Sequence, residues 1–210
     1  MADFRVGDCL ISLGYGTNLT TKAIQWFQRD VLRHPELAWR STHIEVIIAE
    51  NSSRIVTFSQ TFPKAKFVNH NRAYIQNHMI GDKPRYVIFR FRDYSNIVNR
   101  PFVEAMNKWC ADKDGEGKGW KGWWGGVYDV GQLVMYPVNW VARKLGYTKH
   151  IAWLEKTKAN VCSDAVASAY RAGLRFSGFN ENFIFDGIPS SEVTPSHFWI
   201  DEQSKMMRIK

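Results

Sequence analysis

Cys162 is the side chain of this sequence whose position best suits nucleophilic chemistry. It follows Asn160, a good N-cap, and precedes a helical pattern of apolar residues that ends at Gly173. This pattern predicts Cys162 in the first turn of a helix, where unpaired backbone N–H groups and the positive end of the helix dipole favour a thiolate. The same N–H groups can receive the oxyanion of a tetrahedral intermediate. A lone cysteine is more often a small buried apolar residue, so this chemistry needs a partner base.

His43 is the candidate for that base. It begins a β-rich run at residues 42–49, and strand alternation places Glu45 and Ile47 on the same face as His43. A histidine can take a proton from a thiol and return it to a leaving group near neutral pH. Because an isolated strand histidine is more often a hydrogen-bonded structural group, the two residues make a prediction only as a pair.

The rest of the chain predicts one α+β domain over residues 1–210 that positions this pair. Strands are expected near residues 4–13, 42–49, 54–60, 66–68 and 85–92, and helices near 17–34, 101–111, 128–146 and 161–172. Polar turn residues between the second and third strands indicate a hairpin, so the sheet is expected to be mostly antiparallel. Residues 112–126 are rich in glycine, tryptophan and lysine without periodicity, which predicts an inserted loop.

Composition sets limits on the partners and the compartment. The net charge of +8 favours anionic partners such as nucleic acid, anionic lipid headgroups or acidic glycopeptides, although scattered lysines and arginines also fit an ordinary basic surface. Three cysteines without CxxC spacing indicate neither a disulfide framework nor a zinc ribbon, and we expect no metal or cofactor. The sequence shows no signal peptide and no apolar run near the roughly 18 residues of a membrane span. We therefore expect a cytoplasmic protein, with cell lysis or a phage particle as routes to a cell wall.

Five short motifs carry a family resemblance. They are GDCLI at 7–11, STHIEVII at 41–48, VYD at 127–129, NVCSDAVASAYRAG at 160–173 and VTPSHF at 193–198. In this order they resemble the permuted NlpC-type papain-like cysteine hydrolases, especially the YiiX-like group. The resemblance implies a circularly permuted papain-like fold, in which an antiparallel sheet packs against helices and the nucleophile opens a helix. It also implies that Cys162 is the nucleophile and His43 the base, with histidine before cysteine because of the permutation.

The third catalytic group is where this sequence departs from the family. The family places an acid, an amide or a second histidine on the strand after the base, whereas residues 54–60 contain no carboxylate. Ser59 is the first choice for orienting the imidazole, and Thr57 shares its face of the strand. Glu45, on the same face as His43, is the other alternative.

Further residues are candidates for binding substrate. The family motifs point to Asp8, Tyr128 and Asp129, although Asp8, like Asp164 beside the nucleophile, also has a structural interpretation. Trp123 and Trp124 in the inserted loop could stack on sugars or bases or lie at a lipid interface, or could instead cover the helix predicted after them.

Three functions remain open at this point. The first is a thiol peptidase or amidase that forms a thioester acyl-enzyme, with peptidoglycan-type peptides as candidate substrates. The second is a lipid-directed acyltransferase or esterase with the same dyad, as in the related lecithin:retinol acyltransferase branch. The third is a binding module for an anionic polymer, which the missing acid on the second strand of the hairpin favours. Fold alone does not separate them.

Overall fold

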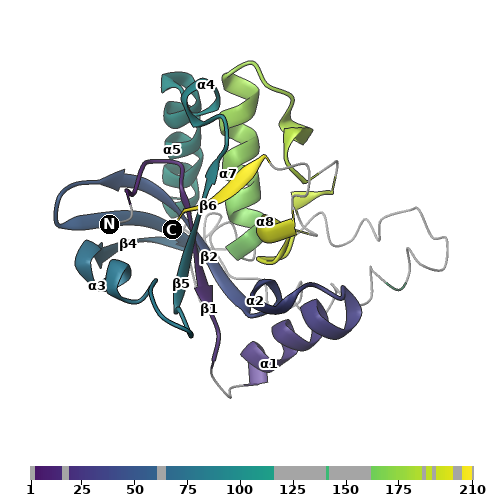
Figure 1. The fold of residues 1–210 in the computed structure, drawn as a ribbon. Coiled ribbons are helices and arrows are strands. Elements are labelled where there is room, and N and C mark those ends of the chain that lie inside the picture. The colour runs from purple at the N-terminus through teal and green to yellow at the C-terminus, as the bar shows by residue number, and fades with distance from the viewer. Residues whose placement is uncertain are drawn as a thin grey trace.

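A six-stranded antiparallel sheet forms the centre of the computed structural model (Figure 1). The structure describes residues 3–15, 19–60, 65–115, 141, 162–185, 188–190, 193–200 and 205–209. The strands are β1 (Cys9–Leu13), β2 (Ser41–Glu50), β3 (Arg54–Gln60), β4 (Ala65–Asn71), β5 (Tyr86–Phe91) and β6 (Met206–Ile209). Their order is β4-β3-β2-β1-β5-β6, so β4 and β6 are the edges and β1 and β2 lie at the centre.

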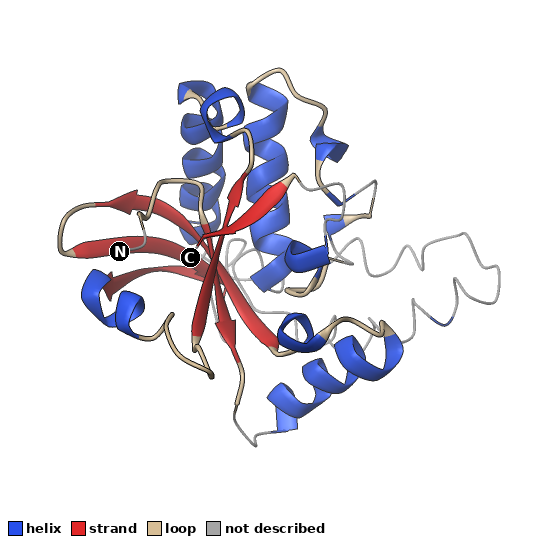
Figure 2. Cartoon of the chain, viewed as in Figure 1, coloured by secondary structure: helices blue, strands red, loops and turns tan. Residues whose placement is uncertain are grey.

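The helices surround this sheet, and the two longest lie side by side (Figure 2). The helical elements are α1 (Leu19–Trp26), the π-helical η1 (Phe27–Val31), α2 (Glu36–Trp39), α3 (Arg72–Asn77), α4 (Tyr94–Ile97), α5 (Arg100–Gly115), α7 (Cys162–Phe176), the 3₁₀-helical η2 (Glu181–Phe183) and α8 (His197–Ile200). No helix in the described part of the chain is both long enough and apolar enough to cross a membrane.

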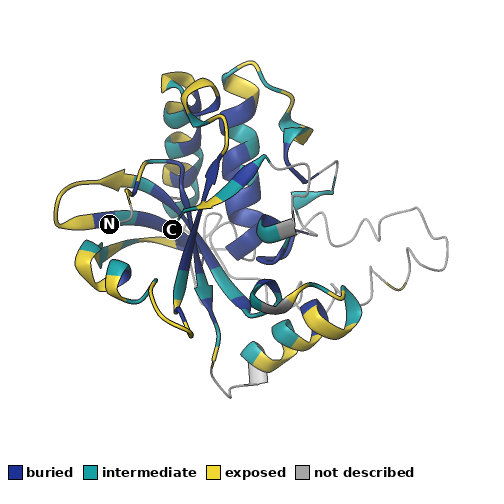
Figure 3. Cartoon of the chain, viewed as in Figure 1, coloured by how far each residue is buried: buried dark blue, intermediate teal, exposed yellow. Residues whose placement is uncertain are grey.

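Much of the central sheet is buried (Figure 3). Strand alternation divides the buried residues between two clusters, one for each face of the sheet. Cys9 and Ile11 of β1 belong to the larger cluster, which includes the apolar faces of α5 and α7. Leu10, between them, belongs to a smaller cluster with Phe4 and Ile75. Because side chains of a strand alternate between faces, β1 serves both cores and fixes the centre of the sheet.

Close packing of α5 and α7 fixes the helix that carries Cys162. A Cβ atom added at Gly173 would lie 2.7 Å from the Phe102 ring, so only glycine lets the two helices approach this closely. One turn before Gly173 on the same helix, the Tyr170 hydroxyl donates a hydrogen bond to the Gly7 carbonyl, 2.7 Å away. Gly7 lies just before β1. The last half of α7 therefore lies over the start of β1, and its first turn lies toward the opposite end, where β2 begins.

The expected α+β class and the mostly antiparallel sheet are confirmed, and several details differ; the strand expected at 4–13, for example, begins only at Cys9. The strand expected at 66–68 is longer, because β4 pairs with β3 from Ala65 to Asn71. The single helix expected at residues 17–34 is instead α1 followed by the π-helical η1, which begins at Phe27.

The inserted loop begins later than expected. Residues 112–115 are helical, so their prediction as loop was wrong. Pairs of residues four apart extend α5 there: Lys108 donates to Asp112 at 2.8 Å, and Lys113 lies 5.7 Å from the centre of the Trp109 ring. Residues 116–126, and the helix expected at 128–146 except for residue 141, lie outside the described residues.

Candidate active site

Cys162 is the first residue of α7, as its sequence position predicts. Its side chain is buried among the residues of the larger core, with 4% of its surface exposed. Backbone N–H groups in the first turn of a helix have no partner within the helix. The thiol therefore lies beside a set of donors that can bind an oxyanion.

His43 lies near the start of β2, opposite Ser12 of β1. Its Nε2 atom is 2.9 Å from the Ser59 hydroxyl and 3.3 Å from Oε1 of Glu45. The Cys162 side chain is close enough to the His43 ring to help raise the pKa of His43. Since Nε2 faces Ser59 and Glu45, we assign Nδ1 to the thiol, an assignment that follows from the hydrogen-bond network.

Cross-strand register brings the remaining polar groups to His43. Glu45 of β2 stands opposite Ser59 of β3, and Thr57 follows on the same face. The second carboxylate oxygen of Glu45, Oε2, accepts a hydrogen bond of 2.5 Å from Thr57 and lies 2.7 Å from Nε2 of His70 on β4. One buried carboxylate thus links histidines from a central strand and from an edge strand.

The electrostatics of this network favour a charged pair. Burial alone would raise the pKa of Glu45, but hydrogen bonds from His43, His70 and Thr57 hold it well below its usual range. Burial likewise opposes protonation of His43, and the charges and hydrogen bonds of Cys162 and Glu45 outweigh it, raising the pKa of His43 to about 10. A histidine in this environment is an imidazolium at neutral pH.

The other two cysteines lie in apolar surroundings. Cys9 and Cys110 are fully buried, and burial raises the pKa of both thiols above the ordinary value. A buried thiol of this kind behaves as a small apolar side chain. Its electrostatic interaction with His43 distinguishes Cys162 from these core positions.

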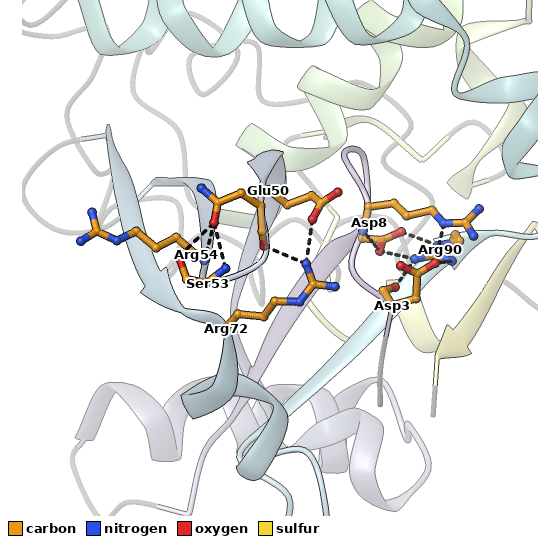
Figure 4. Close-up of polar contacts among 9 residues, drawn as sticks. Asp3, Asp8, Glu50, Ser53, Arg54, Arg72 and Arg90 are labelled. Atoms are coloured by element: carbon orange, nitrogen blue, oxygen red, sulfur yellow. Dashed lines mark hydrogen bonds and ion pairs between the residues drawn. The ribbon is translucent and has the colours of Figure 1, made fainter.

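Asp8 is held in a buried ion pair away from this site (Figure 4). Its two carboxylate oxygens accept hydrogen bonds of 2.7 Å from Nε and Nη2 of Arg90, and Oδ2 also accepts from the Arg5 amide. Asp8 adjoins Gly7, which Tyr170 contacts about 12 Å along the helix from Cys162, at 1.5 Å per residue. These contacts give Asp8 a structural role, and the structure does not bring it to Cys162 as a substrate-binding residue.

The other predicted residues divide into two groups. Asp164 is buried in the first turn of α7 and accepts a hydrogen bond from Ser168 at 3.2 Å, where a carboxylate suits the helix dipole. The four candidate substrate-binding residues of the inserted loop and its flank lie outside the described residues; they are Trp123, Trp124, Tyr128 and Asp129.

His70 is the member of the site that the sequence did not predict. The strand expected at residues 66–68 ends before it, whereas β4 continues to Asn71 and pairs His70 with Ile55. The alternation of residues 66, 68 and 70 is the one signal that could have placed His70 on the face of Thr57. Among the residues that the structure describes, no three His, Cys, Asp or Glu side chains are arranged to hold a metal ion.

Comparisons with known proteins neither support nor contradict the family resemblance of the sequence motifs. No protein-family model and no curated protein matches the chain. The candidate site is therefore defined by the interactions among Cys162, His43, Glu45 and Ser59.

Proposed function

We propose that this protein is a thiol hydrolase of the peptidase or amidase type, with Cys162 as nucleophile and His43 as general acid and base. The observation that carries the proposal is the position of the His43 ring, between the Cys162 thiol and the oxygens of Glu45 and Ser59. A histidine fixed on one side by oxygen partners presents its other nitrogen to the nucleophile, which is the general arrangement of an activated nucleophile. The same contacts support a circularly permuted papain-like fold.

Each step of the proposed reaction uses these groups. The Cys162 thiolate attacks the carbonyl carbon of an amide, and backbone N–H groups at the start of α7 stabilise the oxyanion. The His43 imidazolium gives its proton to the leaving amine, the C–N bond breaks, and a thioester remains on Cys162. Neutral His43 then takes a proton from water, whose oxygen attacks the thioester. The acid product leaves, and the proton on His43 restores the charged pair.

Glu45 supplies the acid that the second strand of the hairpin lacks. It stands on the same strand as the base, and Oε1 lies 3.3 Å from the ring nitrogen that also faces Ser59. A carboxylate stabilises imidazolium more strongly than a hydroxyl does. The missing acid was the main argument for a binding module without chemistry, so the position of Glu45 supports the enzyme.

The acyl donor is tested by the mass of the intact protein after incubation with substrates. We propose an amide of a peptidoglycan-type peptide as donor, and a phospholipid ester is the competing donor. The expected result is a trapped adduct of the peptide acyl mass on Cys162, absent in Cys162→Ser. An adduct of a fatty acyl mass on Cys162 would instead assign a lipid-directed acyltransferase or esterase. If neither the peptide nor the phospholipid is consumed and neither gives a hydrolysis product, the hydrolase proposal fails.

A further inference from the structure

The Glu45 carboxylate lies between two histidines, and only one of them contacts Cys162. Oε1 faces His43 at 3.3 Å, and Oε2 faces His70 at 2.7 Å. Thr57 donates its hydroxyl proton to the same Oε2, at 2.5 Å. The carboxylate is therefore held by one oxygen while the other is presented to the base.

We infer that His70 is a positioning residue for the proposed active site: by holding Oε2 of Glu45 together with Thr57, it keeps Oε1 directed at His43. This inference rests on the proposed function. His70 does not contact Cys162 in this arrangement, and it acts through Glu45 and His43.

Proton positions in the network are consistent with this role. The Thr57 hydroxyl has one proton, and its 2.5 Å contact assigns that proton to Glu45. The Thr57 oxygen then accepts from His70, whose Nε2 atom is 3.1 Å away. Nε2 of His70 must therefore carry a proton, which it shares between Glu45 and Thr57. The His70 ring therefore acts as a donor to the carboxylate.

Burial makes the donors hard to replace. Glu45 is 7% exposed, so water has little access to an oxygen that loses its partner. Removal of His70 leaves Oε2 with the Thr57 hydroxyl but without its second donor, and the loss of a donor to a buried charged acceptor is unfavourable. Without His70, the carboxylate is therefore expected to rotate towards other donors or solvent and to lose its contact with His43.

This anchor lies on an edge strand, although its side chain is less exposed than that of His43, which is 22% exposed. The His70 side chain is 17% exposed on β4, whereas Glu45 is on the central strand β2. The titratable groups that interact with Glu45 come from four strands: His43 on its own strand, His70 on β4, Cys9 on β1 and Tyr86 on β5. Only the two histidines contact its oxygens directly. A change at His70 is therefore transmitted to His43 through Glu45.

The test is the titration of His43 by NMR of ¹⁵N-labelled protein, in wild type, His70→Ala and His70→Gln. Loss of the anchor should lower the His43 midpoint by about one pH unit, since Glu45 then stabilises the imidazolium less. His70→Gln retains an N–H donor at this position and should restore the midpoint to within a fraction of a unit. His78→Ala is the matched control. His78 is hydrogen-bonded to the Tyr74 carbonyl at the end of α3, so its removal should leave the midpoint unchanged.

Other outcomes overturn the inference. If His70 merely competes for the charge of Glu45, its removal will raise the His43 midpoint; if it only stabilises the fold, the midpoint will not move. Should His70→Ala fail to fold, Thr57→Val removes the second donor to the same oxygen and should lower the midpoint in the same direction. If the His43 midpoint is unchanged in His70→Ala while the wild type forms an acyl adduct on Cys162, only the role of His70 is refuted. Absence of that adduct refutes the proposed function whatever the titration shows.

Discussion

Glu45 follows His43 by two residues on one strand and directs a carboxylate oxygen to the imidazole, 3.3 Å from Nε2. The Ser59 hydroxyl approaches the same nitrogen to 2.9 Å from the neighbouring strand. The proposed base therefore has two orienting partners, a buried charge and a neutral hydroxyl. Their relative contributions can be separated by substitution.

Glu45→Gln should lower the rate of acyl transfer to Cys162 far more than Ser59→Ala. Loss of a hydrogen bond from a neutral hydroxyl costs about 1 kcal/mol, or roughly fivefold in rate. Loss of the carboxylate removes the charge that stabilises the imidazolium, and we expect a decrease of about 100-fold. Single-turnover acylation rates measure both effects. A larger loss in Ser59→Ala than in Glu45→Gln would make Ser59 the main orienting group.

Stability should depend on pH through the same two residues. The pKa of His43 is about 10 in the folded protein against an ordinary 6.5, so its contribution is complete below about pH 6.5 and is lost as the pH rises through about 10. The pKa of Glu45 lies below its ordinary 4.5, so its contribution is present above that pH and is lost as the pH falls.

Urea unfolding of wild type and His43→Gln at several pH values tests this dependence. The difference in unfolding free energy between the two proteins should decrease steadily from about pH 6.5 to pH 10, the interval between the ordinary and the folded pKa of His43. Taking the difference cancels the titration of groups that do not interact with His43. A difference that increases with pH over this interval contradicts the raised pKa.

Asp8→Ala should destabilise the fold without removing the chemistry. It leaves Arg90, which is 6% exposed, without its bidentate carboxylate partner and with Asp3 Oδ2, 3.8 Å from Nη1, as its remaining carboxylate contact, at an expected cost of up to about 3–5 kcal/mol. Asp8→Leu combined with Arg90→Met should recover most of that stability, because an apolar pair fills the same space without a charge. Urea unfolding provides the measurement, and acylation per folded molecule should equal that of wild type. Loss of acylation in the stable double variant would show that Asp8 has a role in the active site.

Removal of an exposed ion pair is the control for that experiment. Arg100 and Glu104 form a pair of residues four apart on α5, with side chains 88% and 63% exposed. Glu104→Ala should leave the free energy of unfolding almost unchanged, since exposed pairs contribute little. A loss comparable to that of Asp8→Ala would show that burial is not the cause of the difference.

Local sequence patterns predict one part of the site well. The hairpin of β2 and β3 follows from alternation and a polar turn, and its register places Ser59 beside His43 and Glu45. The helix that begins at Cys162 follows from its N-cap and its apolar stripe. In both the hairpin and the helix, residues near in sequence determine where the side chains of the site lie.

Contacts between distant segments could not be predicted in the same way. His70 reaches Glu45 only because β4 continues past the predicted strand and pairs with β3, a register that no short-range spacing determines. Asp8 pairs with Arg90 from a strand 82 residues away, so its burial was not visible in the motif around it. These contacts depend on the order of strands in the sheet.

The central claim, that His43 activates Cys162, is tested most directly by labelling with a cysteine-reactive acyl probe followed by peptide mapping. We expect one adduct per wild-type molecule, located on Cys162, and a labelling rate that falls about 100-fold in His43→Ala, within the range for loss of a general base. Equal labelling of Cys9 and Cys110, or a rate at Cys162 unchanged in His43→Ala, would contradict the account.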